Sequence, residues 1–155
     1  MKLTAIKRNH SKGISKLMIN DLKNPSNKFP QYMISKFREH AKEENIDKEF
    51  DNPDLIGLMA IENKDVLGFI VGYKDNSSIM LHYVAGKNIT IKKKLLDRLI
   101  KLCKIKNISS LKTDTFEFME NNQLFKSSGF KLTKKEKLTK NLEVLWYELN
   151  LHKIL

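Results

Sequence analysis

The sequence predicts an α/β protein that folds as a single domain over residues 1–155. Its 155 residues suffice for one compact domain with its own core. Apolar residues make up 41% of the chain and charged residues 30%, a balance that favours folding over disorder. Strand-like and helix-like patterns alternate along the chain. Together these observations predict a mixed, mostly antiparallel sheet of about seven strands flanked by about four helices.

The first third of the chain predicts one strand followed by two helices. The two helices show apolar residues at helical spacing, and the segments around them are rich in Asn, Pro and other polar residues. The predicted elements are a strand over Leu3–Arg8, a helix over 11–23 with Ser11 as its N-cap, a turn at 24–27, a helix over 30–44 that begins at Pro30, and a loop over 45–54.

The middle of the chain predicts three antiparallel strands joined by short turns. The runs are rich in branched and aromatic residues, and polar turn residues separate them. They cover residues 55–62, 66–73 and 78–85.

A long amphipathic helix follows, because Ile91, Leu95, Leu99 and Cys103 recur every four residues. Asn107 is expected to end it. The remaining predicted elements are strands at 109–113 and 142–151, the start of a strand at 130–133, and a helix at 116–127 that stops at Gly129.

The composition excludes several kinds of site. A single cysteine, Cys103, rules out an intramolecular disulfide and any multi-cysteine metal centre, and its place on the apolar helix stripe predicts a core residue. His10, His40 and His152 lie too far apart in sequence to suggest a metal site. No apolar run of about 18 residues is present, so we expect no membrane span. The N-terminus lacks an apolar signal core, and the expected compartment is the cytoplasm.

The chain is strongly basic, with 29 Lys and Arg against 18 Asp and Glu and a net charge of +11. Only three of the basic residues are Arg, the residue that reads bases with two hydrogen bonds. This scarcity disfavours nucleic-acid binding without excluding it, and a solvated lysine surface explains most of the excess. The rest is concentrated: residues 86–106 carry +7 and residues 131–140 carry +4.

Two segments and the order of the elements resemble the GNAT superfamily of acyl-CoA-dependent N-acetyltransferases. Residues 84–96, Val-Ala-Gly-Lys-Asn-Ile-Thr-Ile-Lys-Lys-Lys-Leu-Leu, stand where that family has a strand, a glycine-rich loop and a long helix. Residues 120–130, Glu-Asn-Asn-Gln-Leu-Phe-Lys-Ser-Ser-Gly-Phe, resemble the family's later helix-to-strand segment. The resemblance implies an enzyme that moves an acetyl group from acetyl-CoA to an amine of a small molecule, peptide or protein.

The resemblance also implies where the cosubstrate would bind. In the family, backbone N–H groups at a helix N-terminus hold the coenzyme pyrophosphate, and a strand N–H, here of Val84 or Ala85, polarises the thioester. Asn121 would contact the pantetheine arm. The full implied set is Val84, Ala85, Lys87, Asn88, Thr90, Ile91, Lys92, Lys93, Asn121 and Phe125.

This chain departs from the family pattern at three of these positions. Thr90 and Lys92 stand where the family has glycines, and Phe125 stands where it often has a tyrosine acid. Lys92, Lys93 and Lys94 fall in the first turn of the predicted helix, where cations oppose the helix dipole. A bound polyanion would relieve that conflict, and solvated lysines are the alternative.

Amine acylation needs a base, and three residues are candidates for catalysis. His82 could act as the base near neutral pH, or be a strand histidine of no catalytic role. Glu62 could act through water, or be an ordinary charge at a strand end. Tyr83 should face opposite to His82 in a regular strand, as an acid or as core.

Two alternatives to the enzyme remain. The missing glycines and Phe125 motivate a GNAT-like domain that has lost coenzyme A binding and serves as a binding or structural module. The basic segments motivate an RNA-associated protein. The acceptor amine is not readable from the sequence. A homodimer would be in keeping with the resembled family.

Overall fold

The computed structural model describes residues 1–23 and 28–151, and in it a seven-stranded sheet has the order β1-β2-β3-β4-β5-β7-β6. Strands β4 and β5 run parallel and the other neighbouring pairs run antiparallel. This confirms the α/β class and the mixed, mostly antiparallel sheet. The strands are β1 (Lys2–Ala5), β2 (Leu55–Glu62), β3 (Asp65–Asp75), β4 (Ser78–Gly86), β5 (Ser110–Phe116), β6 (Lys131–Thr139) and β7 (Leu142–Asn150).

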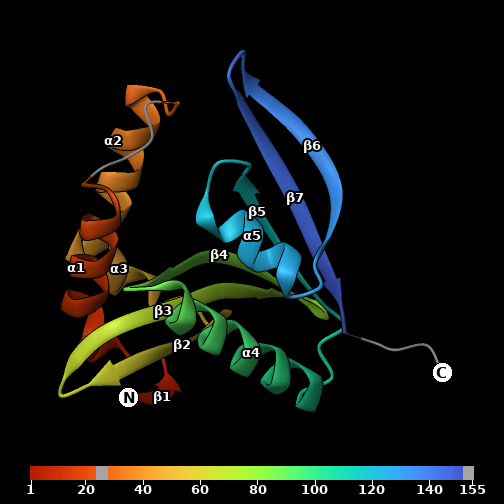
Figure 1. Ribbon diagram of the computed structural model, residues 1–155. Coiled ribbons are helices and arrows are strands. Elements are labelled where there is room, and N and C mark those ends of the chain that lie inside the picture. Colours follow the sequence, from red (N-terminus) through yellow and green to blue (C-terminus); the bar gives the residue numbers. More distant parts are fainter. Residues whose placement is uncertain (24–27, 152–155) are drawn as a thin grey trace.

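Helices cover both faces of the sheet (Figure 1). Helices α1 and α3 pack with Met59, Phe69 and Ala85 on one face. Helices α4 and α5 pack with Ile70 and Leu81 on the other face. The helices are α1 (Ser11–Asp21), α2 (Gln31–His40), α3 (Glu43–Glu49), α4 (Ile89–Ile105) and α5 (Glu120–Ser127), with a short 3-10 turn at Arg8–His10. Within the described part of the chain, no helix is long and apolar enough to cross a membrane.

The described residues contain five α-helices where about four were expected, because the predicted loop at 45–54 begins inside a helix. Helix α3 has Glu43 and Glu44 in its first turn, where negative charge suits the helix dipole. Its Ile46 is buried against α1. A single apolar residue in seven left no periodic pattern in the sequence, so the tertiary contact of Ile46 was not foreseen.

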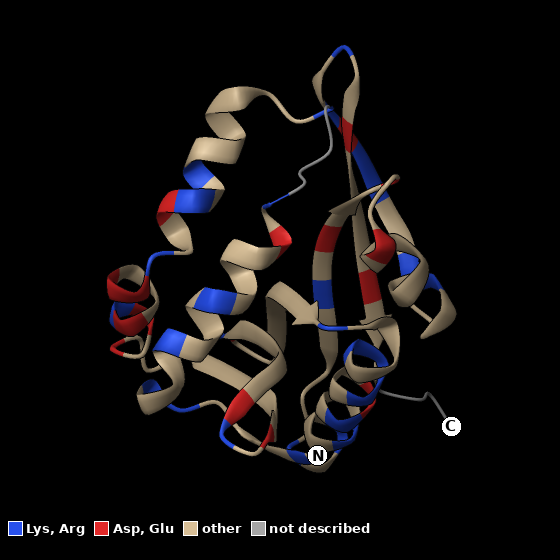
Figure 2. Cartoon of the chain, turned by 60° about the vertical axis from the view of Figure 1, so that its left-hand side comes forward, with Lys and Arg blue, Asp and Glu red and all other residues tan. Residues whose placement is uncertain are grey.

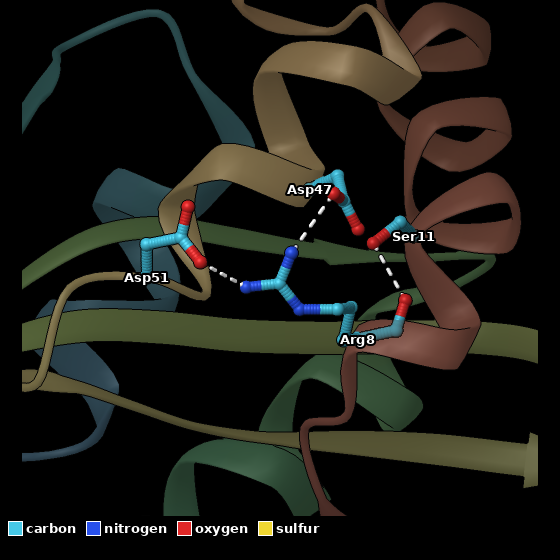
Figure 3. Close-up of polar contacts among 4 residues, drawn as sticks. All are labelled: Arg8, Ser11, Asp47 and Asp51. Atoms are coloured by element: carbon cyan, nitrogen blue, oxygen red, sulfur yellow. Dashed lines mark hydrogen bonds and ion pairs between the residues drawn. The ribbon is translucent and has the colours of Figure 1, made fainter.

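The N-terminal segment also differs from the prediction. Strand β1 ends at Ala5, and the chain then turns through Arg8–His10. Ser11 is the first residue of α1 rather than its N-cap, and its Oγ donates to the carbonyl oxygen of Arg8 at 2.7 Å. The Arg8 guanidinium joins this turn to Asp47 of α3, at 2.9 Å, and to Asp51, two residues beyond that helix (Figure 3). The start of the chain is thereby tied to the helix that sequence patterns missed.

The remaining elements follow the prediction in order, but α5 begins at Glu120 rather than at residue 116, because β5 continues through Phe116. Helix α4 buries Ile91, Leu95, Leu99 and Cys103 along one stripe and ends before Asn107, whose φ of 59° is left-handed. Gly129, with φ of 94°, follows the end of α5. The predicted turn at 24–27 and His152 lie outside the described residues.

Candidate functional site

Strands β4 and β5 pair only at their starts and then diverge (Figure 1). The paired residues of β4 are Ser78, Ile79 and Met80, which match Ser110, Leu111 and Lys112 of β5. Beyond Met80, no strand among the described residues lies beside the edge of β4 that faces β5. Backbone groups along that edge are therefore available to a ligand or to side chains.

A β-bulge lies in β4 at the start of this opening. Val71 of β3 pairs with Tyr83, whereas Gly72 pairs with Leu81, so His82 is the extra residue. The His82 ring meets the Tyr73 ring edge-on at 4.7 Å, and Tyr83 stacks on Phe69 at 5.4 Å. Tyr73 and Phe69 lie on the same face of β3 because they are four residues apart.

The bulge corrects the expectation that Tyr83 faces opposite to His82. Both side chains lie on the sheet face covered by α1 and α3, since two successive residues share a face where a strand carries an extra residue. The Tyr83 hydroxyl lies 3.5 Å from Asp21, at the end of α1, and burial raises the pKa of Tyr83 above its ordinary value. His82 is exposed.

Along the unpaired edge of β4, the backbone N–H of Val84 faces the opening, whereas that of Ala85 faces away from it. The Val84 carbonyl accepts from Asn121 Nδ2 of α5 at 3.2 Å. The N–H and C=O of one strand residue point the same way, so the Val84 N–H also faces the opening. Ala85 points the other way, like Lys87, whose N–H donates to Leu67 of β3 at 2.9 Å.

Helix α4 begins directly after β4 and directs its N-terminus toward the same opening. Asn88 is its N-cap, and the Asn88 side chain accepts from the Ile91 N–H at 3.0 Å. The N–H groups of Ile89 and Thr90 have no partner within the helix by geometry, and both residues are exposed. An anion at this helix end would meet two backbone N–H groups and the exposed side chain of Lys87.

Two of the lysines that could meet phosphate, Lys92 and Lys93, are engaged by protein groups. Lys92 Nζ lies 3.0 Å from Asn121 Oδ1 and 3.2 Å from Glu120 Oε1, and its side chain is only 13% exposed. Lys93 Nζ lies 3.0 Å from Ser128 Oγ and 3.0 Å from Asp97. Figure 2 shows α4 as a strongly basic element beside the acidic end of α5.

Two further predicted residues are not brought to this opening. Phe125 is buried in the core, where its ring meets Phe130 at 5.2 Å and Tyr147 at 6.4 Å. Glu62 is exposed at the β2–β3 turn, two strands away from β4. In the strand register, one residue of β2 is level with Val84. Glu62 lies four residues farther along β2, about 13 Å away in the strand direction.

The structure adds two carboxylates that the sequence reasoning missed. Asp114 of β5 lies two residues beyond the last β4–β5 pair, at the same level as His82 of β4. Burial raises the pKa of Asp114, and the nearby charge of His82 lowers it by less. Burial likewise raises the pKa of Asp21, which the Lys92 charge partly offsets. No alternation of apolar and polar residues marked Asp114 in the sequence, because residues 112–115 are all polar.

The fold defined by these features is that of the GNAT N-acetyltransferases, whose solved structures match nearly the whole chain. An aminoglycoside 6'-acetyltransferase type Ii superposes with a TM-score of 0.78 and 14% identity, over 99% of each chain. The ribosomal-protein-S18-alanine N-acetyltransferase from Escherichia coli gives 0.76 and 11%, over 99% of this chain and 95% of its own.

A third solved structure contains the coenzyme. It is the PaiA N-acetyltransferase from Thermoplasma acidophilum in complex with coenzyme A, with a TM-score of 0.75 and 17% identity, over 97% of this chain and 99% of its own. No protein-family model and no curated protein matches the sequence. At these identities the likeness establishes the GNAT fold.

Proposed function

We propose that this protein is an N-acetyltransferase that transfers an acetyl group from acetyl-CoA to an amine of a small molecule, a peptide or a protein. The observation that carries the proposal is the unpaired edge of β4, which presents the Val84 N–H beside the N-terminus of α4 and directly after the His82 bulge. A strand edge and a helix N-terminus together suit a ligand with both amide and phosphate groups.

The residues present fit acetyl-CoA at the helix end and along the strand. The N–H groups of Ile89 and Thr90, with Lys87, would hold phosphate, and Val84 would bond the arm of the cosubstrate. When bound, acetyl-CoA would supply a thioester whose C–S bond breaks as the new N–C bond forms, and the leaving thiolate would take up the amine's second proton and depart as free coenzyme A. The Val84 N–H would donate to the carbonyl oxygen as negative charge develops on it.

His82 is the proposed base. Its exposed ring lies on the sheet face that α1 and α3 cover, so an amine would approach from that side. There Nδ1 or Nε2 would take the proton that the ammonium must lose before it can attack. Asp114, level with His82 across the opening, would favour the protonated ring once the proton has moved.

Binding of acetyl-CoA tests the proposal directly. At 100-fold excess over its dissociation constant, a ligand stabilises the folded state by about 2.7 kcal/mol. For a domain of this size that corresponds to a rise in melting temperature of about 5–11 °C. A panel of amines, with release of free thiol as the readout, then identifies the acceptor. If the melting temperature does not change at any acetyl-CoA concentration, the proposed enzymatic function is refuted.

One observation favours a second candidate, a binding module of the same fold without coenzyme A. The Lys92 side chain stands where the resembled family has a glycine, and it is bonded across the opening to α5. Absence of a thermal shift, together with absence of heat in calorimetry with coenzyme A, would favour this module over the enzyme.

A further inference from the structure

The Lys92 side chain runs from the first turn of α4 to α5. Its aliphatic stem packs over Gly86, where an added Cβ would come within 3.1 Å of Lys92 Cγ. Its Nζ reaches α5, where Asn121 and Glu120 both contact it. The side chain is 13% exposed, far less than the 58% of its partner Glu120. Lys92 is thus packed against the protein rather than extended into solvent.

Asn121 links this lysine to the strand. Its Oδ1 accepts from Lys92 Nζ at 3.0 Å, and its Nδ2 donates to the Val84 carbonyl at 3.2 Å. One amide therefore ties β4, α4 and α5 together at the open end of the diverging strands. The Val84 carbonyl already has a partner in this arrangement, so a ligand that lies along this edge must displace Asn121 or bond beside it.

We propose that Lys92 blocks the coenzyme route and must move before the pantetheine arm reaches Val84. The proposal rests on the acetyltransferase function given above and names a control on cosubstrate entry. Glu120 holds the blocking position, since its carboxylate offsets the repulsion between the Lys92 cation and the positive end of α4. Lysine has a flexible stem, so it can leave without a change in the backbone.

Two ligands separate a blocking lysine from a phosphate-binding one. Coenzyme A carries both the phosphates and the arm, whereas adenosine 3',5'-bisphosphate carries phosphates without the arm. Calorimetry with each is to be run on the natural chain and on Lys92→Ala, with Lys94→Ala as the control. Lys94 lies in the same turn, is exposed and carries the same charge. The Ala side chain keeps helix propensity high, which Gly would not.

The expected result is that Lys92→Ala binds coenzyme A about tenfold more tightly, while bisphosphate binding does not improve. Lys94→Ala should bind neither ligand more tightly than the natural chain does. Glu120→Gln should give a smaller gain for coenzyme A than Lys92→Ala. Its matched control is Asp97→Asn, which removes a carboxylate that pairs with Lys93 instead, and which should leave coenzyme A binding as in the natural chain.

The following outcomes each contradict part of the proposal. Equal loss of both ligands in Lys92→Ala would make Lys92 a phosphate ligand and refute the block. Unchanged coenzyme A affinity would refute it as well. If neither the natural chain nor any variant binds coenzyme A, the proposed acetyltransferase function itself fails, and the blocking role fails with it.

Discussion

Helix α4 packs closely on the sheet only because Gly68 has no side chain. A Cβ at this position would lie 2.7 Å from Ile91 Cγ2, 2.8 Å from the Ala85 carbonyl oxygen and 3.1 Å from Leu95 Cδ1. The carbonyl belongs to the backbone of β4, so it cannot rotate away. The variant Gly68→Ala must therefore lift the first turns of α4 from the sheet.

Overpacking of this kind costs about 1–3 kcal/mol. For a domain of this length, each kcal/mol lowers the melting temperature by about 2–4 °C, so Gly68→Ala should melt about 2–12 °C lower. Thermal and urea unfolding followed by circular dichroism measure this. Because the first turn of α4 carries the proposed phosphate site, acetyl-CoA should also bind more weakly.

Gly13→Ala is the matched control for the binding experiment. Its Cβ would meet Val66 Cγ2 at 2.6 Å, on the opposite face of the sheet from α4. It should therefore leave acetyl-CoA binding unchanged whatever it does to stability. If Gly68→Ala has the same melting temperature as the natural chain and binds acetyl-CoA equally well, the close packing of α4 on β3 and β4 is refuted.

Four further outcomes are expected. His82→Gln should lower turnover of an identified amine about 100-fold or more at neutral pH and leave the melting temperature nearly unchanged; equal loss of stability would make His82 structural. Burial raises the pKa of Asp114 above its unfolded value, so the natural chain loses stability as the pH rises from the unfolded pKa through the folded pKa; urea unfolding over a series of pH values should show Asp114→Asn gaining stability relative to the natural chain across that interval, and a parallel pH profile would contradict this. Burial raises the pKa of Cys103 to about 11, so a thiol reagent at pH 8 should modify it only after unfolding; rapid modification of the folded protein would disprove its burial. Asn88→Ala should cost about 1 kcal/mol through loss of the α4 cap, and an unchanged unfolding midpoint would show that the cap contributes nothing.

The sequence alone determined the order of most elements because each of their signals lies within one element. The four-residue repeat of Ile91, Leu95, Leu99 and Cys103 predicted α4, and all four side chains are buried. The three apolar runs predicted the antiparallel strands β2, β3 and β4. The same order, with the two segments around α4 and α5, carried the resemblance to the fold that the solved structures show.

The tertiary structure decided what depends on contacts between elements. The extra residue in β4, which turns His82 and Tyr83 to one face, is defined only by register against β3. The contact of Lys92 with Asn121 joins residues 29 positions apart, on two helices. Asp114 is level with His82 because the parallel register pairs Met80 with Lys112, two residues before each of them. Local periodicity reports which face of an element is buried, whereas the partner across that face is set by how the chain folds back on itself. The basic stretch at 86–106 was visible in the sequence from the start, and only the folded chain shows that Lys92 within it bonds to α5.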